Sequence, residues 1–382
     1  MRSVIATSER TSVDLEVAKG DLERVRVSSP ASPDLADGEV RVRVDVFALT
    51  SNNITYAVLG EMLNYWDFFP AAPADEGDDT DWGRIPVWGF GDVVESRSSD
   101  VEVAERIYGY LPMSSEVVLT AGRGDEQGFS DRSGHRADLP GTYNRYMRCA
   151  ADPSYRPDRE AQQMLLSPLF FTAFMIDDLI ADNGDFGAER VIVSSASSKT
   201  AIGVAFMAHR RGMPVIALTS PGNAAFVEEL GVYESVVTYD ELGSLPVSSS
   251  VYVDIAGNRD VVHGVHDHLG DELRHSLTVG VSHWDHATEL APDAELSGPQ
   301  PVFFFAPDQI AKRTKDWGPG GVQERVGEAW IAFSGWTDRW LALQHPTGPD
   351  QVVGVYRELL AGGVDPRKGF VATLTQPDSP AR

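Results

Sequence analysis

The sequence predicts an α/β protein of two domains, in which a β-barrel precedes a doubly wound parallel sheet. Its 382 residues are long for a single hydrophobic core. Residues 1–155 are rich in short apolar runs broken by glycine and proline, which is typical of barrel strands. Residues 156–305 alternate strand-like and helix-like segments, which favours a parallel sheet. Residues 306–382 predict helices and a last strand that returns to the first domain.

The elements of the first domain follow from the spacing of its apolar residues. Residues 39–50, EVRVRVDVFALT, alternate apolar and polar side chains and predict a half-buried strand. Residues 84–96 and 106–120 are apolar runs interrupted by glycine or proline, and they predict short strands. Residues 160–184, at the start of the second domain, change to a helical period, with an interruption expected at Pro168 and an end at an Asn-Gly pair.

The second domain is predicted as a series of βα units. Its expected elements are strand 190–195, helix 200–212, strand 213–220, helix 223–231, strand 234–239, strand 248–257, helix 261–275 and strand 276–284. In the C-terminal segment, residues 321–343 and 349–363 are expected to form helices, and residues 369–375 the returning strand.

The composition argues against several classes of partner. With a net charge of −25 and a pI of about 4.6, the surface should repel the phosphates of nucleic acids and anionic membranes. No apolar run is expected to reach the ~20 residues that span a bilayer. Residues 1–20 lack the apolar segment of a secretory signal. A single cysteine, Cys149, excludes an internal disulfide and a zinc site of several cysteines. A cytoplasmic protein is therefore expected.

Residues 191–208, VIVSSASSKTAIGVAFMA, form the frame of a nucleotide-binding unit: a strand, a loop of small residues and a helix. The loop lacks the G-x-G-x-x-G pattern of dinucleotide sites, and the stretch has one glycine, Gly203. Backbone N–H groups and the dipole at the helix N-terminus still favour an anion. The hydroxyl groups of the loop could donate hydrogen bonds to this anion, and a lysine would add a positive charge. The candidate cofactor-binding residues are Ser195, Ser197, Ser198, Lys199 and Thr200. The alternative is a serine-rich turn that only caps the helix.

The end of the next predicted strand bears on the choice of cofactor. NAD-specific sites usually place a carboxylate there for the ribose hydroxyls, whereas this strand ends in Thr219 and Ser220. The missing carboxylate permits the 2′-phosphate of NADP. No Arg or Lys follows directly to bind that phosphate, so NADP is permitted and not demanded.

Several stretches resemble the medium-chain dehydrogenase/reductase superfamily, in its zinc-free quinone-reductase-like branch. They are DGEVRVRVDVFALTSNNITYAVLG (37–60), IPVWGFGDVVES (85–96), GTYNRYMRCA (141–150), LSPLFFTAFMIDDL (166–179) and VIALTSPGNAAFVEELGVYESVVTYDEL (215–242). The resemblance implies a GroES-like barrel and a Rossmann-type domain, with the substrate in the cleft between them. With its altered nucleotide loop, the chain resembles a subfamily of unknown function within this superfamily.

The resemblance also implies roles for particular residues. It places Tyr56 beside the nicotinamide, as a proton donor, and Asn52 and Asn53 near a substrate oxygen. The alternative is that Tyr56 only packs under the cofactor lobe and that the two asparagines shape a turn. The resemblance also places Tyr239 near the adenosine of NADP. His283, just after a predicted strand, is a candidate contact of the substrate or the nicotinamide.

Metal binding is not expected. Zinc-using relatives carry Cys or His and a His-Glu pair in two loops, where this chain has ALTSNN (48–53) and VWGFGD (87–92). His263 and His266 lie one helical turn apart, which suits a metal or, alternatively, a solvated helix face. The aromatic stretch 61–70 either lines an apolar substrate cleft or belongs to the barrel core.

The sequence therefore predicts a zinc-independent, NADP(H)-dependent reductase of enones, quinones or similar activated carbonyl compounds. Its partner would be a small-molecule substrate, with neither nucleic acid nor membrane bound, and a homodimer is compatible with this function. Two alternatives stay open. One is a non-redox lyase, dehydratase or cyclase that has lost dinucleotide binding, and the other is a non-catalytic protein that binds a small molecule.

Overall fold

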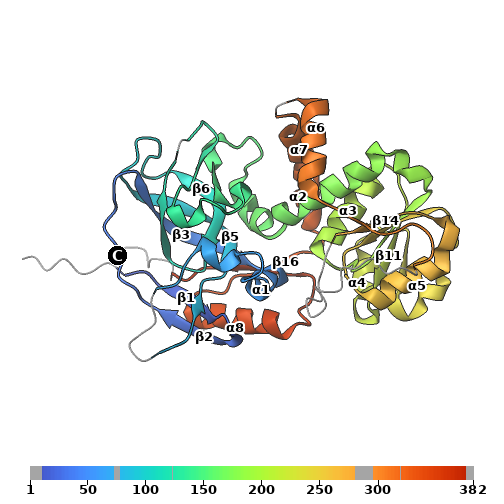
Figure 1. Cartoon of the computed structure of the whole chain (residues 1–382), viewed down its shortest axis with the longest axis horizontal. Coiled ribbons are helices and arrows are strands. Elements are labelled where there is room, and N and C mark those ends of the chain that lie inside the picture. Colours follow the sequence, from blue (N-terminus) through green and yellow to red (C-terminus); the bar gives the residue numbers. More distant parts are fainter. Residues whose placement is uncertain (1–10, 73–77, 123, 280–295, 319, 376–382) are drawn as a thin grey trace, which may run out of the picture. The chain divides into compact units, whose positions relative to one another are not determined.

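The computed structural model describes residues 11–72, 78–122, 124–279, 296–318 and 320–375. The chain forms two compact units (Figure 1). The first comprises Met1–Leu165 with Leu341–Arg382, and the second Leu166–Trp340. The second unit therefore continues past the boundary expected at 305.

The first unit is built on two sheets. The larger has the strand order β16-β17-β3-β5-β6-β9-β8, with β7 paired to β3, and the smaller has the order β2-β1-β4. The strands are β1 (Asp14–Ala18), β2 (Asp21–Ser28), β3 (Glu39–Leu49), β4 (Trp82–Gly83), β5 (Pro86–Ser96), β6 (Arg106–Pro112), β7 (Glu116–Thr120), β8 (Gly128–Ser130), β9 (Arg145–Arg148), β16 (Ala342–Gln344) and β17 (Lys368–Ala372). β17 pairs antiparallel with β3, so the end of the chain completes the larger sheet.

Strand β3 explains why the first sheet forms. Val40, Val42 and Val44 alternate with polar residues and are buried in the core of this unit. The glycines of β5 let that strand approach β3 closely. A Cβ atom on Gly89 would lie 2.6 Å from the carbonyl oxygen of Val46, closer than any side chain allows.

Among the described residues, two α-helices lie entirely within the first unit. Helix α1 (Ser51–Val58) follows β3, and helix α8 (Pro349–Ala361) lies against β2. The Tyr356 hydroxyl of α8 donates to the carbonyl oxygen of Leu22 over 2.9 Å. The loop expected after the first barrel strand is thus a short helix, and this helix carries Asn52, Asn53 and Tyr56.

Helix α2 (Glu160–Asp182) corrects two expectations. It runs through Pro168 without a break. A proline inside a helix costs ~3 kcal/mol, and burial of neighbours such as Leu166 and Phe170 offsets that cost. The segment Pro157–Asp182 is also long and apolar enough to cross a membrane, which the sequence analysis did not expect. More than half of its most apolar window is buried in the protein, as in a core helix.

The second unit is a six-stranded parallel sheet with the order β12-β11-β10-β13-β14-β15, flanked by helices (Figure 1). Its strands are β10 (Arg190–Val193), β11 (Val215–Thr219), β12 (Ser235–Thr238), β13 (Ser250–Asp254), β14 (Leu273–Thr278) and β15 (Val302–Phe303). Its helices besides α2 are α3 (Lys199–Arg210), α4 (Ala224–Glu229), α5 (Arg259–Leu269), α6 (Ala306–Trp317) and α7 (Gly321–Thr337). The chain winds in one direction from β10 to β12 and in the other from β13 to β15, which is the predicted doubly wound order.

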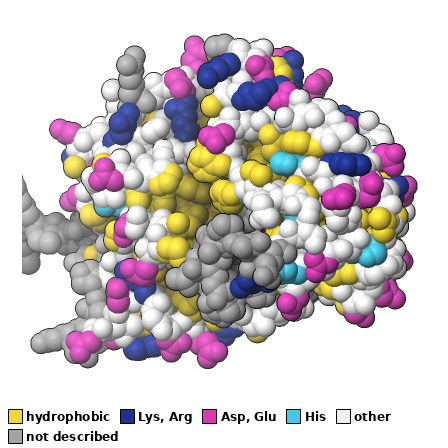
Figure 2. Space-filling model, turned by 45° about the vertical axis from the view of Figure 1, so that its right-hand side comes forward, with side chains coloured by type: hydrophobic (Ala, Val, Ile, Leu, Met, Phe, Trp, Pro, Cys, Tyr) yellow, Lys and Arg dark blue, Asp and Glu magenta, His cyan; other side chains and the backbone are white. Residues whose placement is uncertain are grey.

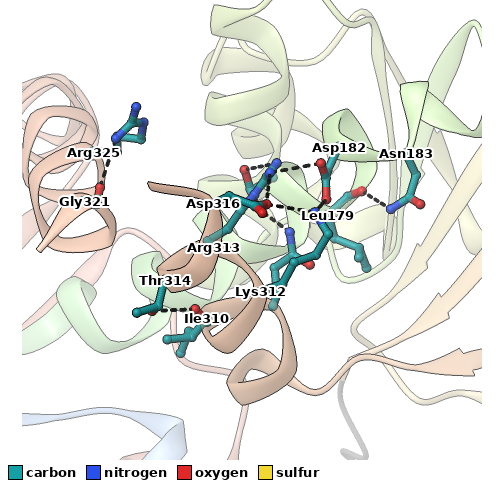
Figure 3. Close-up of polar contacts among 12 residues, drawn as sticks. Leu179, Asp182, Asn183, Ile310, Lys312, Arg313, Thr314, Asp316, Gly321 and Arg325 are labelled. Atoms are coloured by element: carbon teal, nitrogen blue, oxygen red, sulfur yellow. Dashed lines mark hydrogen bonds and ion pairs between the residues drawn. The ribbon is translucent and has the colours of Figure 1, made fainter. Parts of the chain in front are cut away.

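Three elements differ from the sequence expectation. The helix expected over 321–343 ends at Thr337, and residues 342–344 form strand β16 of the first unit. The helix expected over 261–275 ends at Leu269, because Gly270 has a φ of 50° and Leu273 begins a strand. Helix α6 was not predicted. It is held on α2 by charge pairs, and Arg313 places Nε 2.7 Å from Oδ2 of Asp178. Figure 3 shows Arg313 and Lys312 of α6 pairing with Asp182 of α2.

Acidic side chains are spread over the visible face of the molecule and do not form one field (Figure 2). Many are paired with arginine. Arg106, for example, contacts Asp45, Asp92 and Glu160 within the first unit. On this face, the acidic side chains are therefore dispersed among other side chains.

Candidate functional site

The loop between β10 and α3 lies at the point where the strand order of the parallel sheet reverses. β10 pairs with β11 on one side and with β13 on the other. In doubly wound sheets, ligands bind at the carboxyl ends of the strands beside this point. The loop of residues 194–198 is therefore placed as a binding loop would be.

Ser195 adopts a conformation that glycine normally takes. Its φ of 51° is left-handed, which is strained for a residue with a side chain. Its backbone N–H donates to the hydroxyl of Tyr239 over 2.9 Å, from the end of β12. The structure thus joins two predicted cofactor residues, with Tyr239 supporting the backbone of the loop.

The other serines of the loop have local partners. Ser198 caps α3 by accepting a hydrogen bond from the N–H of Ala201 over 3.3 Å. The Ser197 hydroxyl accepts from Nδ2 of Asn223 over 3.0 Å. The capping alternative therefore holds for the Ser198 side chain.

Two backbone donors remain at the start of α3. Among the described residues, the N–H groups of Ser197 and Thr200 have no hydrogen-bond acceptor. Lys199, the first residue of α3, is half-exposed. Free N–H groups at a helix N-terminus beside a lysine form an arrangement that attracts an anion.

The two candidate residues at the end of β11 differ in their exposure to solvent. Thr219 is 1% exposed and belongs to the sheet interior, whereas Ser220 is half-exposed. Of this pair, only Ser220 presents accessible surface for a ribose or its phosphate.

Ser194 and Asp254 form a buried pair that sequence reasoning missed. The Ser194 hydroxyl donates to Oδ1 of Asp254 over 2.7 Å and accepts from the N–H groups of Ile255 and Ala256. Burial raises the pKa of Asp254. The pair ties the loop after β10 to the loop after β13, on both sides of the reversal point. The signal available was an aspartate that ends the apolar strand VYVD.

In the first unit, the two predicted asparagines have different roles. Asn53 is buried. Its Oδ1 accepts from the N–H of Thr50 over 2.7 Å, and its Nδ2 donates to the carbonyl oxygen of Pro86. It therefore fixes the start of α1, as the turn-shaping alternative states. Asn52 instead donates from Nδ2 to the hydroxyl of Tyr56 over 2.7 Å.

Tyr56 is nearly buried among aromatic rings. Its ring centroid lies 4.6 Å from that of Tyr65 and 5.6 Å from that of Tyr110. Burial raises the pKa of Tyr56 above its usual value, so the phenol stays protonated at physiological pH. Because Asn52 donates to its oxygen, the Tyr56 hydroxyl proton remains available to another acceptor.

The remaining candidates lie elsewhere. In the stretch 61–70, Trp66, Phe68 and Phe69 are buried in the core of the first unit, and Tyr65 is half-buried. His266 is buried and contacts the carbonyl oxygen of Ser297 and the Ser276 hydroxyl. No group of three metal-type side chains occurs among the described residues. His283 lies outside the described residues.

A model of the family described as protein of unknown function (DUF2855) matches residues 47–365. No curated protein matches the chain.

Solved structures share both units of the chain. CurA from Vibrio vulnificus in complex with NADPH is 14% identical, with a TM-score of 0.60 over 96% of this chain and 99% of that one. A mutant form of enoyl thioester reductase from Candida tropicalis is 14% identical, with a TM-score of 0.56 over 95% and 99%. A putative NADPH:quinone reductase from Bacillus thuringiensis is 14% identical, with a TM-score of 0.54 over 95% and 99%. These likenesses confirm the predicted fold.

Proposed function

We propose an activity for this chain, which belongs to the DUF2855 family: reduction of enones, quinones or similar activated carbonyl compounds by NADPH, without zinc. The observation that carries the proposal is the β10–loop–α3 unit, which offers free N–H groups at the reversal point of a doubly wound sheet. CurA, whose fold is similar, was crystallised with NADPH.

The residues of the loop fit a dinucleotide. The N–H groups of Ser197 and Thr200, the hydroxyl of Thr200 and the charge of Lys199 would hold the phosphates. Ser220 would face the ribose without the repulsion that a carboxylate brings to a 2′-phosphate. When bound, NADPH supplies a hydride to the substrate.

The first unit would supply the proton that reduction also requires. Tyr56 would be the donor, because its phenol is protonated at physiological pH and Asn52 donates to its oxygen, which leaves the hydroxyl proton for an acceptor. Asn53 would support both residues by fixing the start of α1.

Zinc independence is supported by residue types. Segments 48–53 and 87–92 contain no Cys, His or Glu. The one carboxylate among them, on Asp92, accepts hydrogen bonds from Arg43 and Arg106, each over 3.0 Å. A carboxylate held by two guanidinium groups is a poor metal ligand.

The test is calorimetric titration with NADPH and NADH, followed by the loss of NADPH absorbance with an enone and with a quinone. We expect NADPH to bind more tightly than NADH and to be consumed only when substrate is present. Activity should persist after dialysis against a chelator. Absence of binding by both dinucleotides would refute the proposal and favour a non-redox enzyme on this scaffold.

A further inference from the structure

The sequence has one Asn-Gly pair, formed by Asn183 and Gly184. It follows helix α2 directly, and Asn183 is exposed. Residues 184–187 have φ values of 60°, 54°, 54° and 72°, so the chain turns there in the left-handed sense. The pair therefore lies at the surface, in a turn that the structure sets apart from the helix before it.

The backbone nitrogen of Gly184 is not engaged or shielded. Within the described part of the chain, its N–H donates to no hydrogen-bond acceptor. Chain neighbours apart, no heavy atom of the described residues lies within 4 Å of the place that a Cβ would occupy on Gly184. Glycine itself has no side chain to cover its amide. This nitrogen is therefore open to reaction with the side-chain amide of the preceding residue.

The Asn183 side chain supports the end of α2. Figure 3 shows its Nδ2 donating to the carbonyl oxygen of Leu179, over 2.8 Å. Such a donor caps carbonyl groups of the last helical turn. The preceding carboxylate, on Asp182, binds Lys312 and Arg313 of α6. A carboxylate at position 183 would remove the donor and place a negative charge at the negative end of the helix dipole.

We propose that Asn183 is a site of spontaneous deamidation, a modification that is independent of the proposed reductase function. The Gly184 nitrogen loses its proton and bonds to Cγ of Asn183, while the side-chain nitrogen takes up a proton and departs as ammonia. Water then adds to one of the two carbonyl carbons of the resulting five-membered ring, and the bond from that carbon to the ring nitrogen breaks. The product is an aspartyl or isoaspartyl residue at position 183.

The experiment incubates the purified full-length chain below its Tm, at neutral and at mildly alkaline pH. Released ammonia is measured, and mass spectrometry of peptides locates each amide that has become a carboxyl group. Tryptic peptide 160–190 contains Asn183 as its single asparagine. Asn64 is the internal control, because it is also exposed and has a left-handed φ of 57°, but is followed by Tyr65.

We expect the modified fraction at Asn183 to exceed that at Asn64 by about tenfold or more, because a tyrosine side chain slows attack by its own amide nitrogen. Modification should be faster at the alkaline pH, since the attacking nitrogen must lose a proton. Asn183→Gln keeps the amide but requires a six-membered ring, which closes more slowly, so this variant should release little ammonia.

The effect on stability is tested with Asn183→Asp, which reproduces the new charge. Its Tm should lie about 2–4 °C below that of the freshly purified wild type. The Tm of aged wild-type protein should fall toward the same value. Asn64→Asp is the matched control, because it adds the same charge at an exposed position outside α2, and its Tm should equal that of the wild type.

Four results would overturn the inference. The first is an unmodified Asn183 in the folded chain when the urea-unfolded chain is modified there, because the turn would then protect the pair. The others are equal modification of Asn64, ammonia release from Asn183→Gln at the wild-type rate, and an unchanged Tm for Asn183→Asp.

Discussion

The loop after β10 and the residues around Tyr56 differ in how their polar groups are partnered. In the loop, Ser194, Ser197 and Ser198 already hold groups of the protein, and only a few backbone donors remain. Around Tyr56, Asn52 donates to the phenol oxygen, and the rings of Tyr65 and Tyr110 pack against the ring of Tyr56. Loop side chains should therefore carry mainly stability, and the Tyr56 hydroxyl mainly the rate of reduction. Substitutions can break or sharpen this contrast.

The largest effect is expected for Tyr56→Phe. The change removes the proposed proton donor and keeps the ring, so kcat should fall by ~10²- to 10⁴-fold with little change in NADPH affinity. Because the pKa of Tyr56 is raised, wild-type kcat should not decline where an ordinary tyrosine ionises. Steady-state kinetics across pH provide the measurement. A variant that retains full kcat would remove Tyr56 from the mechanism, and Tyr356→Phe serves as the control.

Ser194→Ala should have the next largest effect, on stability. It leaves the buried Asp254 carboxylate and the N–H groups of Ile255 and Ala256 without their shared partner. The free energy of unfolding should fall by about 2–4 kcal/mol. Denaturant unfolding measures it, with Ser220→Ala as a half-exposed control. Equal free energies of unfolding for the two variants would show that the buried pair does not hold the loops together.

Lys199→Ala should weaken NADPH binding about ten- to a hundredfold, because a charge-assisted hydrogen bond to phosphate is worth ~1.5–3 kcal/mol. The Tm should change little, since a half-exposed lysine contributes little to stability. Calorimetry with wild type and variant tests this. Lys315→Ala, on the exposed side of α6 in the same unit, is the matched control and should bind NADPH as wild type does. Equal affinity in all three proteins would exclude Lys199 from the site.

The sequence predicts the elements of this fold where the pattern is local. Alternation identified β3, and βα units identified the parallel sheet. Helix α6 was missed because its support is distant: Arg313 pairs with Asp178 from another part of the chain. The break expected at Pro168 was wrong because local rules omit the packing that keeps α2 helical through the proline.

In the candidate site too, the sequence predicts local features and misses contacts between distant residues. Position at a strand–helix junction is a local property, so the loop could be singled out from sequence. The partnership of Ser194 with Asp254 and of Ser195 with Tyr239 joins residues far apart along the chain, and no spacing rule reveals it. The roles of Asn52 and Asn53 likewise became distinct only once the carbonyl of Pro86 was seen beside Asn53.

The smallest effect is expected for Ser195→Gly, which tests how the loop keeps its conformation without a glycine. Ser195 holds a φ of 51°, where a side chain is strained and glycine is not. Ser195→Gly should keep the backbone hydrogen bond to Tyr239, which uses the N–H and not the side chain. We expect a gain of ~0.5–1 kcal/mol in the free energy of unfolding, reduced somewhat by the greater freedom of glycine in the unfolded chain. Ser220→Gly is the matched control, because its φ of −74° carries no such strain and the same change should lower stability there. If both variants lose stability in denaturant unfolding, the Ser195 side chain supports the loop, and the contrast between a loop that carries stability and a tyrosine that carries rate becomes sharper.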